Sequence, residues 1–292
     1  MLDEDDGGSE DGEEDLLDAE IPDVPEFDPR DVAMSWTVLS KIAKSPAHLR
    51  HAAMIGRTDE GSLSMKMGRN FHAVALGDPF VLFEPGQFTD KKGKIKTHKG
   101  VRSGEAWAQF KAEHAGKCIM SPSEFRRAHA MTQALLANAD ATRILFGPGV
   151  EREACVEWEK DGRKMRSHID AWKRGEWLAD LKMVKDAKPD HYQRSGQWAN
   201  HHTQVCLYDE ADRFITGRPD DVEIPLYLVT VEGAPPYPVV VWQLDATSLD
   251  AGRRTIGAWW NYLRICEESN QWPGYSQHIE TFVCDSNDED AA

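Results

Sequence analysis

The stretch that decides the fold is EACVEWEKDGRKMRSHIDAWKRGEWLADLKM, residues 153–183. Apolar and polar residues alternate over 153–159 and again over 164–172, which is the period of a half-buried strand. Between these two runs stands Asp161-Gly162, a dipeptide favoured by two-residue hairpin turns. A second turn precedes a third apolar run over 176–183. The stretch therefore predicts a three-stranded meander.

Helical patterns surround this meander. Upstream, apolar spacing predicts helices over 35–53 (with a break at Ser45-Pro46), over 67–76, and from the Ser121-Pro122 cap onward. Downstream, the pattern predicts a helix over 189–212, a strand pair over 226–232 and 239–244, and a helix over 246–268. Residues 88–104, rich in Lys and Gly, predict a mobile loop. This order of elements predicts an α/β fold with a central sheet flanked by helices.

The formal net charge of −16 is concentrated at the two ends of the 292-residue chain. Residues 1–24 carry 12 Asp or Glu and no Lys or Arg, and residues 285–292 carry four acids and no base. The remaining 34 acids match the 34 Lys and Arg of residues 25–284. We therefore expect a disordered acidic tail, one folded domain over 25–284, and an acidic C-terminal tail. The first tail is either a solvated extension or a mimic of DNA that occupies a basic groove.

Composition also argues against several classes of protein. No apolar run reaches the roughly 18 residues of a membrane span, and the acidic start has no signal-peptide pattern, so we expect a cytoplasmic protein. The cysteines have no CxxC spacing, which argues against a disulfide framework and a zinc knuckle. They are Cys118, Cys155, Cys206, Cys266 and Cys284.

Two acids and a lysine fall within the predicted meander. Asp170 is expected at the end of one strand, and Asp180 lies on the next strand, across a turn. Paired strands would bring these carboxylates together to share a hard cation. Lys182 follows Asp180 by two residues, so alternation places both side chains on the same face of the sheet. Carboxylates that hold Mg²⁺ beside a lysine are what hydrolysis of a phosphodiester requires.

Two further patterns add polar groups to this site. On the following helix, residues spaced four, three and four apart form one polar stripe; they are Gln197, His201, Gln204 and Tyr208. Upstream, His72 follows Gly68 on a predicted helix, and its imidazole is a candidate metal ligand. Tyr208 is expected to donate to a phosphate or to stack on a base.

Taken in order, these motifs resemble a known family. The segments SWTVLSKIAKSPAHLRHA, GRNFHAVAL, HIDAW, ADLKMV and QVCLYDEA are similar to the corresponding motifs of RecE-type (exonuclease VIII-like) phage recombination exonucleases, in the PD-(D/E)XK nuclease superfamily. The resemblance covers residues 33–212 and implies the PD-(D/E)XK core, a central mixed β-sheet flanked by helices. Ile169 stands in place of the Pro of the superfamily name, and Asp180 stands where many members have Glu.

The resemblance also implies roles for individual residues. It makes His72, Asp170 and Asp180 metal ligands, with the carbonyl of Leu181 as a further one, for Mg²⁺ or a substituting Mn²⁺. Lys182 becomes the catalytic lysine, and the residues that order the site and the DNA backbone become Gln204 and Tyr208. On the preceding strand, two candidate outer ligands stay unranked; they are Glu153 and Glu157.

The activity implied by the resemblance is 5′ to 3′ digestion of linear double-stranded DNA, which leaves 3′ overhangs for a single-strand annealing protein. A homo-oligomeric ring, a trimer or tetramer, and an origin in a phage or prophage within a bacterial host are implied with it. Since phosphates are bound by Lys, Arg and hydroxyl groups, we expect DNA contacts from the basic loop 91–99 and from Ser35, Lys41, Lys44 and Arg50.

Two alternatives stay open. One is a non-catalytic DNA-binding or inhibitory protein on a nuclease scaffold, against which the joint presence of Asp170, Asp180 and Lys182 argues. The other is a Cas4- or AddB-like nuclease with an iron–sulfur cluster, which would need four clustered cysteines, whereas these are dispersed.

Overall fold

The computed structural model describes residues 28–56, 62–276 and 278–282. The predicted acidic tails, 1–24 and 285–292, lie outside the described residues, so their disorder stays a prediction. Of the helices in the described part of the chain, none combines the length and the apolarity needed to cross a bilayer.

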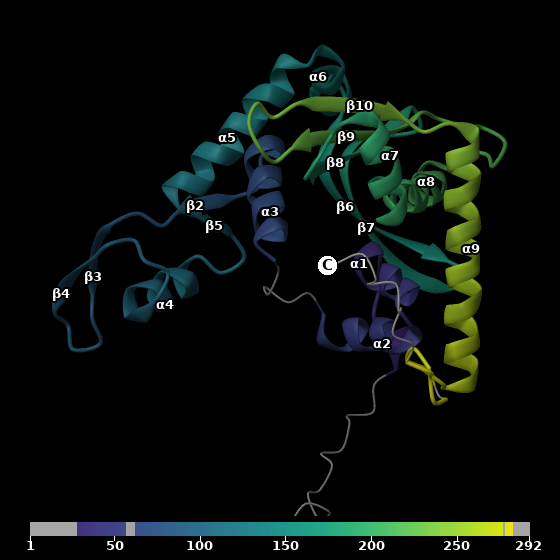
Figure 1. Cartoon of the computed structure of the whole chain (residues 1–292), viewed down its shortest axis with the longest axis horizontal. Coiled ribbons are helices and arrows are strands. Elements are labelled where there is room, and N and C mark those ends of the chain that lie inside the picture. The colour runs from purple at the N-terminus through teal and green to yellow at the C-terminus, as the bar shows by residue number, and fades with distance from the viewer. Residues whose placement is uncertain (1–27, 57–61, 277, 283–292) are drawn as a thin grey trace, which may run out of the picture.

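A six-stranded mixed sheet forms the centre of the protein (Figure 1). Its longest strand, β7, pairs antiparallel with β6 and β8 and parallel with the short β1. Strand β9 lies parallel to β8, and β10 pairs antiparallel with β9. The predicted meander and strand pair are confirmed. The strands are β1 (Met34–Ser35), β6 (Glu151–Lys160), β7 (Arg163–Lys173), β8 (Trp177–Val184), β9 (Leu226–Glu232) and β10 (Val239–Gln243).

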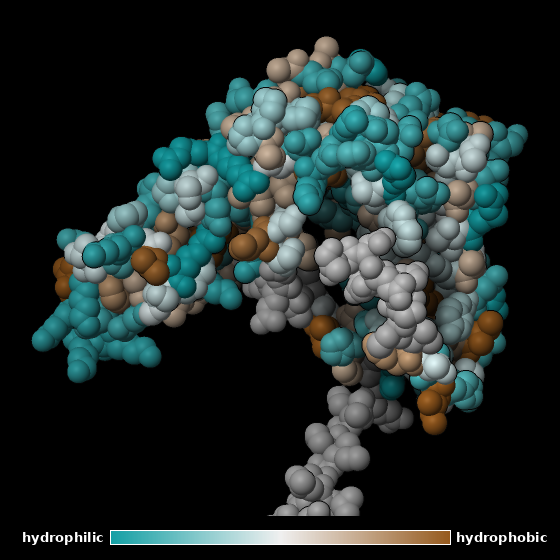
Figure 2. All heavy atoms as spheres, in the orientation of Figure 1, coloured by the Kyte–Doolittle hydropathy of each residue, from teal (hydrophilic) through white to brown (hydrophobic). Residues whose placement is uncertain are grey.

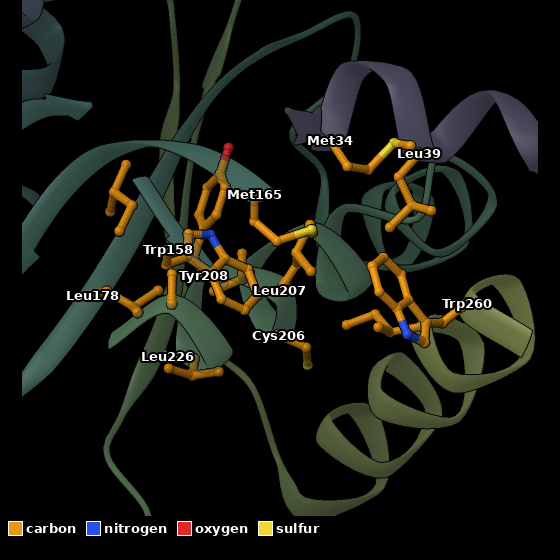
Figure 3. Close-up of a cluster of buried hydrophobic side chains, with 14 of the residues drawn as sticks. Met34, Leu39, Trp158, Met165, Leu178, Cys206, Leu207, Tyr208, Leu226 and Trp260 are labelled. Atoms are coloured by element: carbon orange, nitrogen blue, oxygen red, sulfur yellow. The ribbon is translucent and has the colours of Figure 1, made fainter. Parts of the chain in front are cut away.

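Helices cover both faces of this sheet, because each face carries its own apolar cluster. One cluster joins the sheet to α8, α9 and the N-terminal helices, and includes Trp158, Met165, Leu207 and Trp260 (Figure 3). The other joins the sheet to α3, α5 and α6. The helices are α1 (Trp36–Leu39), α2 (Pro46–Ile55), α3 (Leu63–Leu76), α5 (Pro122–Ala137), α6 (Ala139–Phe146), α8 (His201–Thr216) and α9 (Ala246–Ser269), with the short 3-10 turns η1 (Pro29–Asp31) and η2 (Ser40–Ala43).

Local sequence explains where these elements begin and turn. Asp161 and Gly162 both have positive φ, 48° and 79°, as the two-residue hairpin turn between β6 and β7 requires. Ser45 accepts a hydrogen bond from the backbone N–H of His48 and caps α2, which confirms the predicted break. Ser121 forms a capping box at the start of α5.

The helix predicted over 189–212 is two helices, α7 (Pro189–Trp198) and α8. The chain breaks at Asn200, whose φ of 56° lies in the left-handed region that Asn tolerates better than most residues. Gln197 is therefore exposed on a separate helix from His201, Gln204 and Tyr208. The prediction that these four residues form one polar stripe was wrong for Gln197.

The prediction of a mobile loop over 88–104 is also wrong. These residues belong to a structured arm, which comprises residues 80–120. The arm stands apart from the sheet in Figure 1. A hairpin forms its far part, and a two-stranded parallel stem, β2 with β5, joins it to α3 and α5. Its elements are β2 (Phe80–Leu82), β3 (Gly86–Thr89), β4 (Ile95–His98), α4 (Gly104–Glu113) and β5 (Cys118–Met120).

Candidate active site

The candidate site lies where β7 and β8 part. The ladder between these strands ends at the pair Ala171 and Ala179. Beyond that pair, the backbone N–H of Leu181 donates to Asp170 Oδ2 at 2.7 Å. A side chain thus takes the place of a ladder bond, and Asp170 is fixed beside the strand that carries Asp180. Asp170 lies inside β7, which continues to Lys173, so its predicted place at the end of the strand was wrong.

Asp180 is the centre of a hydrogen-bonded group. Lys182 Nζ lies 2.5 Å from Asp180 Oδ2, as alternation on one face predicted. On the other side, Gln204 Nε2 donates to Asp180 Oδ1 at 3.0 Å and to the Tyr208 hydroxyl at 2.6 Å. Asp180 is only 1% exposed, so these contacts hold a buried carboxylate in one orientation.

Tyr208 lies behind Gln204, between the site and the apolar core. Its ring packs in the apolar cluster drawn in Figure 3, with the hydroxyl at the edge of that cluster. Because the residue is 4% exposed, it has no open ring face on which a base could stack, and that expectation was wrong. Helix α8 is buried from Thr203 to Asp209, which fixes the position of Gln204 relative to the sheet.

A second group of side chains comes together next to Asp170. His72 Nδ1, on α3, lies 3.8 Å from Asp170 Oδ1 and 3.7 Å from Glu153 Oε1. One ligand atom from each of the three residues lies within 4.8 Å of the others. Glu153 Oε2 also lies 3.1 Å from Nδ1 of His168, whose side chain is about half exposed.

Glu153 has an unusual backbone. Its φ is 51°, and the ladder between β6 and β7 omits its pairing with Asp170, although the pairs on both sides are formed. Strain of this kind costs about 1–3 kcal/mol and is concentrated at functional sites. In addition, Glu153 Oε1 is buried and accepts no hydrogen bond from any described residue. Of the two candidate outer metal ligands, Glu153 lies in the site, whereas Glu157 is exposed and pairs with Arg166.

Burial and neighbouring charges shift the pKa values of three groups at the site. Burial raises the pKa of Asp180 to about 6, which outweighs the opposing charge of Lys182. Burial disfavours the charged form of His72, but the nearby carboxylates of Asp170 and Glu153 raise its pKa above the ordinary value. Burial and the neighbouring Lys182 lower the pKa of His201 to about 3, so this ring is neutral; its Nδ1 lies 2.9 Å from the Tyr192 hydroxyl.

The residues present fit a divalent cation. Two carboxylates and one imidazole form a donor set of hard oxygens with one nitrogen, which suits Mg²⁺ or Mn²⁺. Glu153 Oε1, which is buried and accepts no hydrogen bond, supplies a lone pair to this set. Within the described residues no other group of His, Cys, Asp and Glu meets the same distance criterion, and the four described cysteines lie on separate elements, β5, β6, α8 and α9.

The predicted DNA-contacting residues lie on the first elements of the described chain. Ser35 is on β1, Lys41 on η2, and Arg50 on α2; all three are partly exposed, whereas Lys44 is exposed. Nothing in the structure assigns them a ligand, so their role stays a prediction.

The fold and this set of side chains together define a PD-(D/E)XK nuclease. The family described as the PDDEXK-like domain of unknown function (DUF3799) matches residues 35–285, and the chain belongs to this family. A comparison with curated proteins gives no match.

Among solved structures, the chain is similar to a protein from Eubacterium rectale described as a "Putative exonuclease", with a TM-score of 0.56 and 12% sequence identity. The similarity covers 86% of this chain and 91% of that one. At this identity the likeness concerns the fold.

Proposed function

We propose that the protein is a divalent-metal-dependent exodeoxyribonuclease that digests linear double-stranded DNA from its ends. The observation that carries the proposal is the joint placement of two groups at the parting of β7 and β8. One group is the cation-binding set His72, Glu153 and Asp170, and the other is Asp180 with its partner Lys182.

Mg²⁺, or Mn²⁺ in its place, would be held by His72, Glu153 and Asp170. The family resemblance implies His72 and Asp170 as ligands and adds Asp180 and the carbonyl of Leu181. A divalent cation at this point supplies Lewis acidity and makes a bound water a stronger nucleophile. The unpartnered Glu153 Oε1 and the donor set support this assignment.

The protein's own side chains would prepare the rest of the reaction. The side chain of Lys182 is 20% exposed and its ammonium group lies against Asp180 Oδ2, where it would offset negative charge that develops on the scissile phosphate. Gln204 holds one oxygen of Asp180 and leaves the other to Lys182. Tyr208 fixes the amide of Gln204 through its hydroxyl. These two are positioning residues, because both are buried behind the carboxylate.

The finer features follow from the resemblance to RecE-type exonucleases. They are 5′ to 3′ polarity, 3′ overhangs passed to a single-strand annealing protein, and a ring of three or four copies around the DNA. Contacts from Ser35, Lys41, Lys44 and Arg50 belong to the same proposal.

The test is digestion of end-labelled linear duplex and of covalently closed circles, each with Mg²⁺ and with EDTA. We expect linear duplex to be degraded only with Mg²⁺ and closed circles to be spared, since threading requires a free end. Cutting of closed circles would indicate an endonuclease and would contradict the proposed ring around the DNA. Binding of DNA without Mg²⁺-dependent cleavage would instead support the non-catalytic alternative.

A further inference from the structure

The arm concentrates positive charge in a chain whose folded part is otherwise acidic. Residues 85–102 hold six Lys or Arg and one Asp. The rest of residues 25–284 holds 28 bases and 33 acids. The hairpin of β3 and β4 therefore carries a surplus of five positive charges, while the remaining fold has a deficit of the same size.

Most of this charge is open to solvent. The exposed lysines of the hairpin and its flank are Lys91, Lys92, Lys94, Lys96 and Lys99. Of these five lysines, Lys96 alone forms an ion pair with a described residue, Asp90, at 2.8 Å. Between these lysines, Ile95 exposes 72% of its surface. The hairpin thus presents ammonium groups that the protein itself does not neutralise.

The hairpin is held in place by its own small core. The rings of Phe83 and His98 stack with centroids 4.8 Å apart, and Trp107 and Phe110 of α4 pack against Phe83. Gln109 donates to the carbonyl of Thr89 at 2.7 Å, which ties α4 to β3. A basic surface with this support is pre-organised, so little ordering is needed when a ligand binds.

The arm connects directly to the candidate active site. Helix α3, which carries His72, runs into β2 at the start of the arm, and β5 leads back into α5. Figure 1 shows α3 between the arm and the sheet, and Figure 2 shows the arm projecting from the body of the protein with hydrophilic residues at its outer end. The arm is thus joined through a short connection to the helix that supplies His72 to the site.

We propose that the arm is a second nucleic-acid contact, which binds the phosphate backbone of duplex DNA outside the active site. This inference rests on the proposed function and specifies how its substrate is held. Ammonium groups bind phosphates without reading sequence. Single strands are usually bound by stacking on open aromatic rings, but the rings of the hairpin and α4 are turned into the arm's own core. Phe83 is 2% exposed, and Phe88, Trp107 and Phe110 are partly buried. A surface of lysines therefore favours the duplex.

The test compares two double variants of the full chain. K92Q/K94Q removes two exposed charges from the arm, and R254Q/R264Q removes two exposed charges from α9 as a matched control. For each, the dissociation constant is measured over a salt series in Ca²⁺, on blunt duplexes of increasing length and on single strands. Turnover in Mg²⁺ at saturating DNA is measured alongside.

We expect K92Q/K94Q to lower the slope of log affinity against log salt by about 1.8 on long duplex, at about 0.9 per phosphate contact. This corresponds to affinity weaker by up to about 60-fold at 0.1 M salt. The shortest duplexes, the single strands and turnover should change little, and the control should match the parent protein.

Equal slopes for the two double variants would overturn the proposal. So would an equal loss on single strands, or tighter duplex binding by K92Q/K94Q, which would indicate that the arm holds the chain's own acidic tail. If the parent protein binds duplex with the expected arm dependence yet never cleaves it, the proposed activity fails and the arm contact stands. If it cleaves and the slopes are equal, only the arm contact fails.

Discussion

Replacing Glu153 by Gln should separate what this residue does for metal binding from what it does for folding. The change keeps the shape of the side chain and removes its charge. In the metal-free protein, Glu153 Oε1 is buried without a hydrogen-bond partner, which costs about 1–3 kcal/mol of stability for a polar group and more for a charged one. Gln would weaken two contacts, one with the half-exposed His168 and one with His72 Nδ1, 3.7 Å from Oε1. Solvent-screened pairs of this kind contribute at most about 1 kcal/mol each.

The effect of Glu153→Gln on the free energy of unfolding should therefore have opposite signs in the absence and in the presence of metal. Without metal, Glu153→Gln should be as stable as the parent protein or more stable by about 2 kcal/mol, a rise of several degrees in Tm at about 2–4 °C per kcal/mol. Loss of a ligand carboxylate should weaken metal affinity by at least the factor of about 10–100 that follows loss of an outer partner. At saturating metal, that factor removes about 1.4–2.7 kcal/mol of metal-induced stabilisation.

The assay is thermal unfolding in EDTA and across a Mg²⁺ or Mn²⁺ titration, together with nuclease rates. Glu157→Gln is the matched control, because Glu157 lies on the same strand with its side chain 72% exposed. The control should stay within about 0.5 kcal/mol of the parent protein under both conditions. A Glu153→Gln protein that is destabilised in EDTA and gains as much from metal as the parent would refute the reasoning and make Glu153 a structural residue.

Three further outcomes are expected. Asp180→Ala and Lys182→Ala should each abolish Mg²⁺-dependent digestion of linear duplex with the fold intact by circular dichroism, and near-full activity in either variant would remove these two residues from the chemistry. Because burial raises the pKa of Asp180 to about 6, its carboxyl holds a proton below that pH which the cation must displace. Through Asp180, the Mg²⁺ concentration for half-maximal rate should therefore rise by up to about tenfold per pH unit below pH 6. Protonation of His72, whose pKa is also raised, should add to this rise, and Asp180→Asn is the comparison for binding. Removing residues 1–23 should tighten duplex binding in Ca²⁺ and steepen its salt dependence if the 12 acids of the tail compete with DNA, whereas identical curves would make the tail a solvated extension.

The central sheet could be predicted from sequence because period-two alternation and turn residues are local signals. Asp161-Gly162 fixes the turn, and counting pairs back from Lys160 and Arg163 places Glu153 opposite Asp170. This count was available from the sequence and would have ranked Glu153 above Glu157. The proximity of Asp180 and Lys182 followed from alternation alone.

The remaining features depend on tertiary contacts that no local pattern shows. The break at Asn200 requires a left-handed residue between two segments that each look helical. The arm was misread because lysines and glycines dominate its sequence, while its order comes from the packing of Phe83 on α4 and His98. Burial of Tyr208 is set by the sheet beneath α8, so spacing on the helix could not reveal that its ring is closed to DNA.

The stem of the arm has a consequence for how this fold diversifies. The backbone N–H of Cys118 donates to the carbonyl of Pro79 at 3.1 Å, so the chain leaves the body and returns to it one hydrogen bond apart. A segment with adjoining ends and a private core is a module that evolution or an engineer can shorten, exchange or remove without reconnecting the sheet. The same geometry lets the arm open as a separate cooperative unit, with its amides exchanging earlier than those of the central strands.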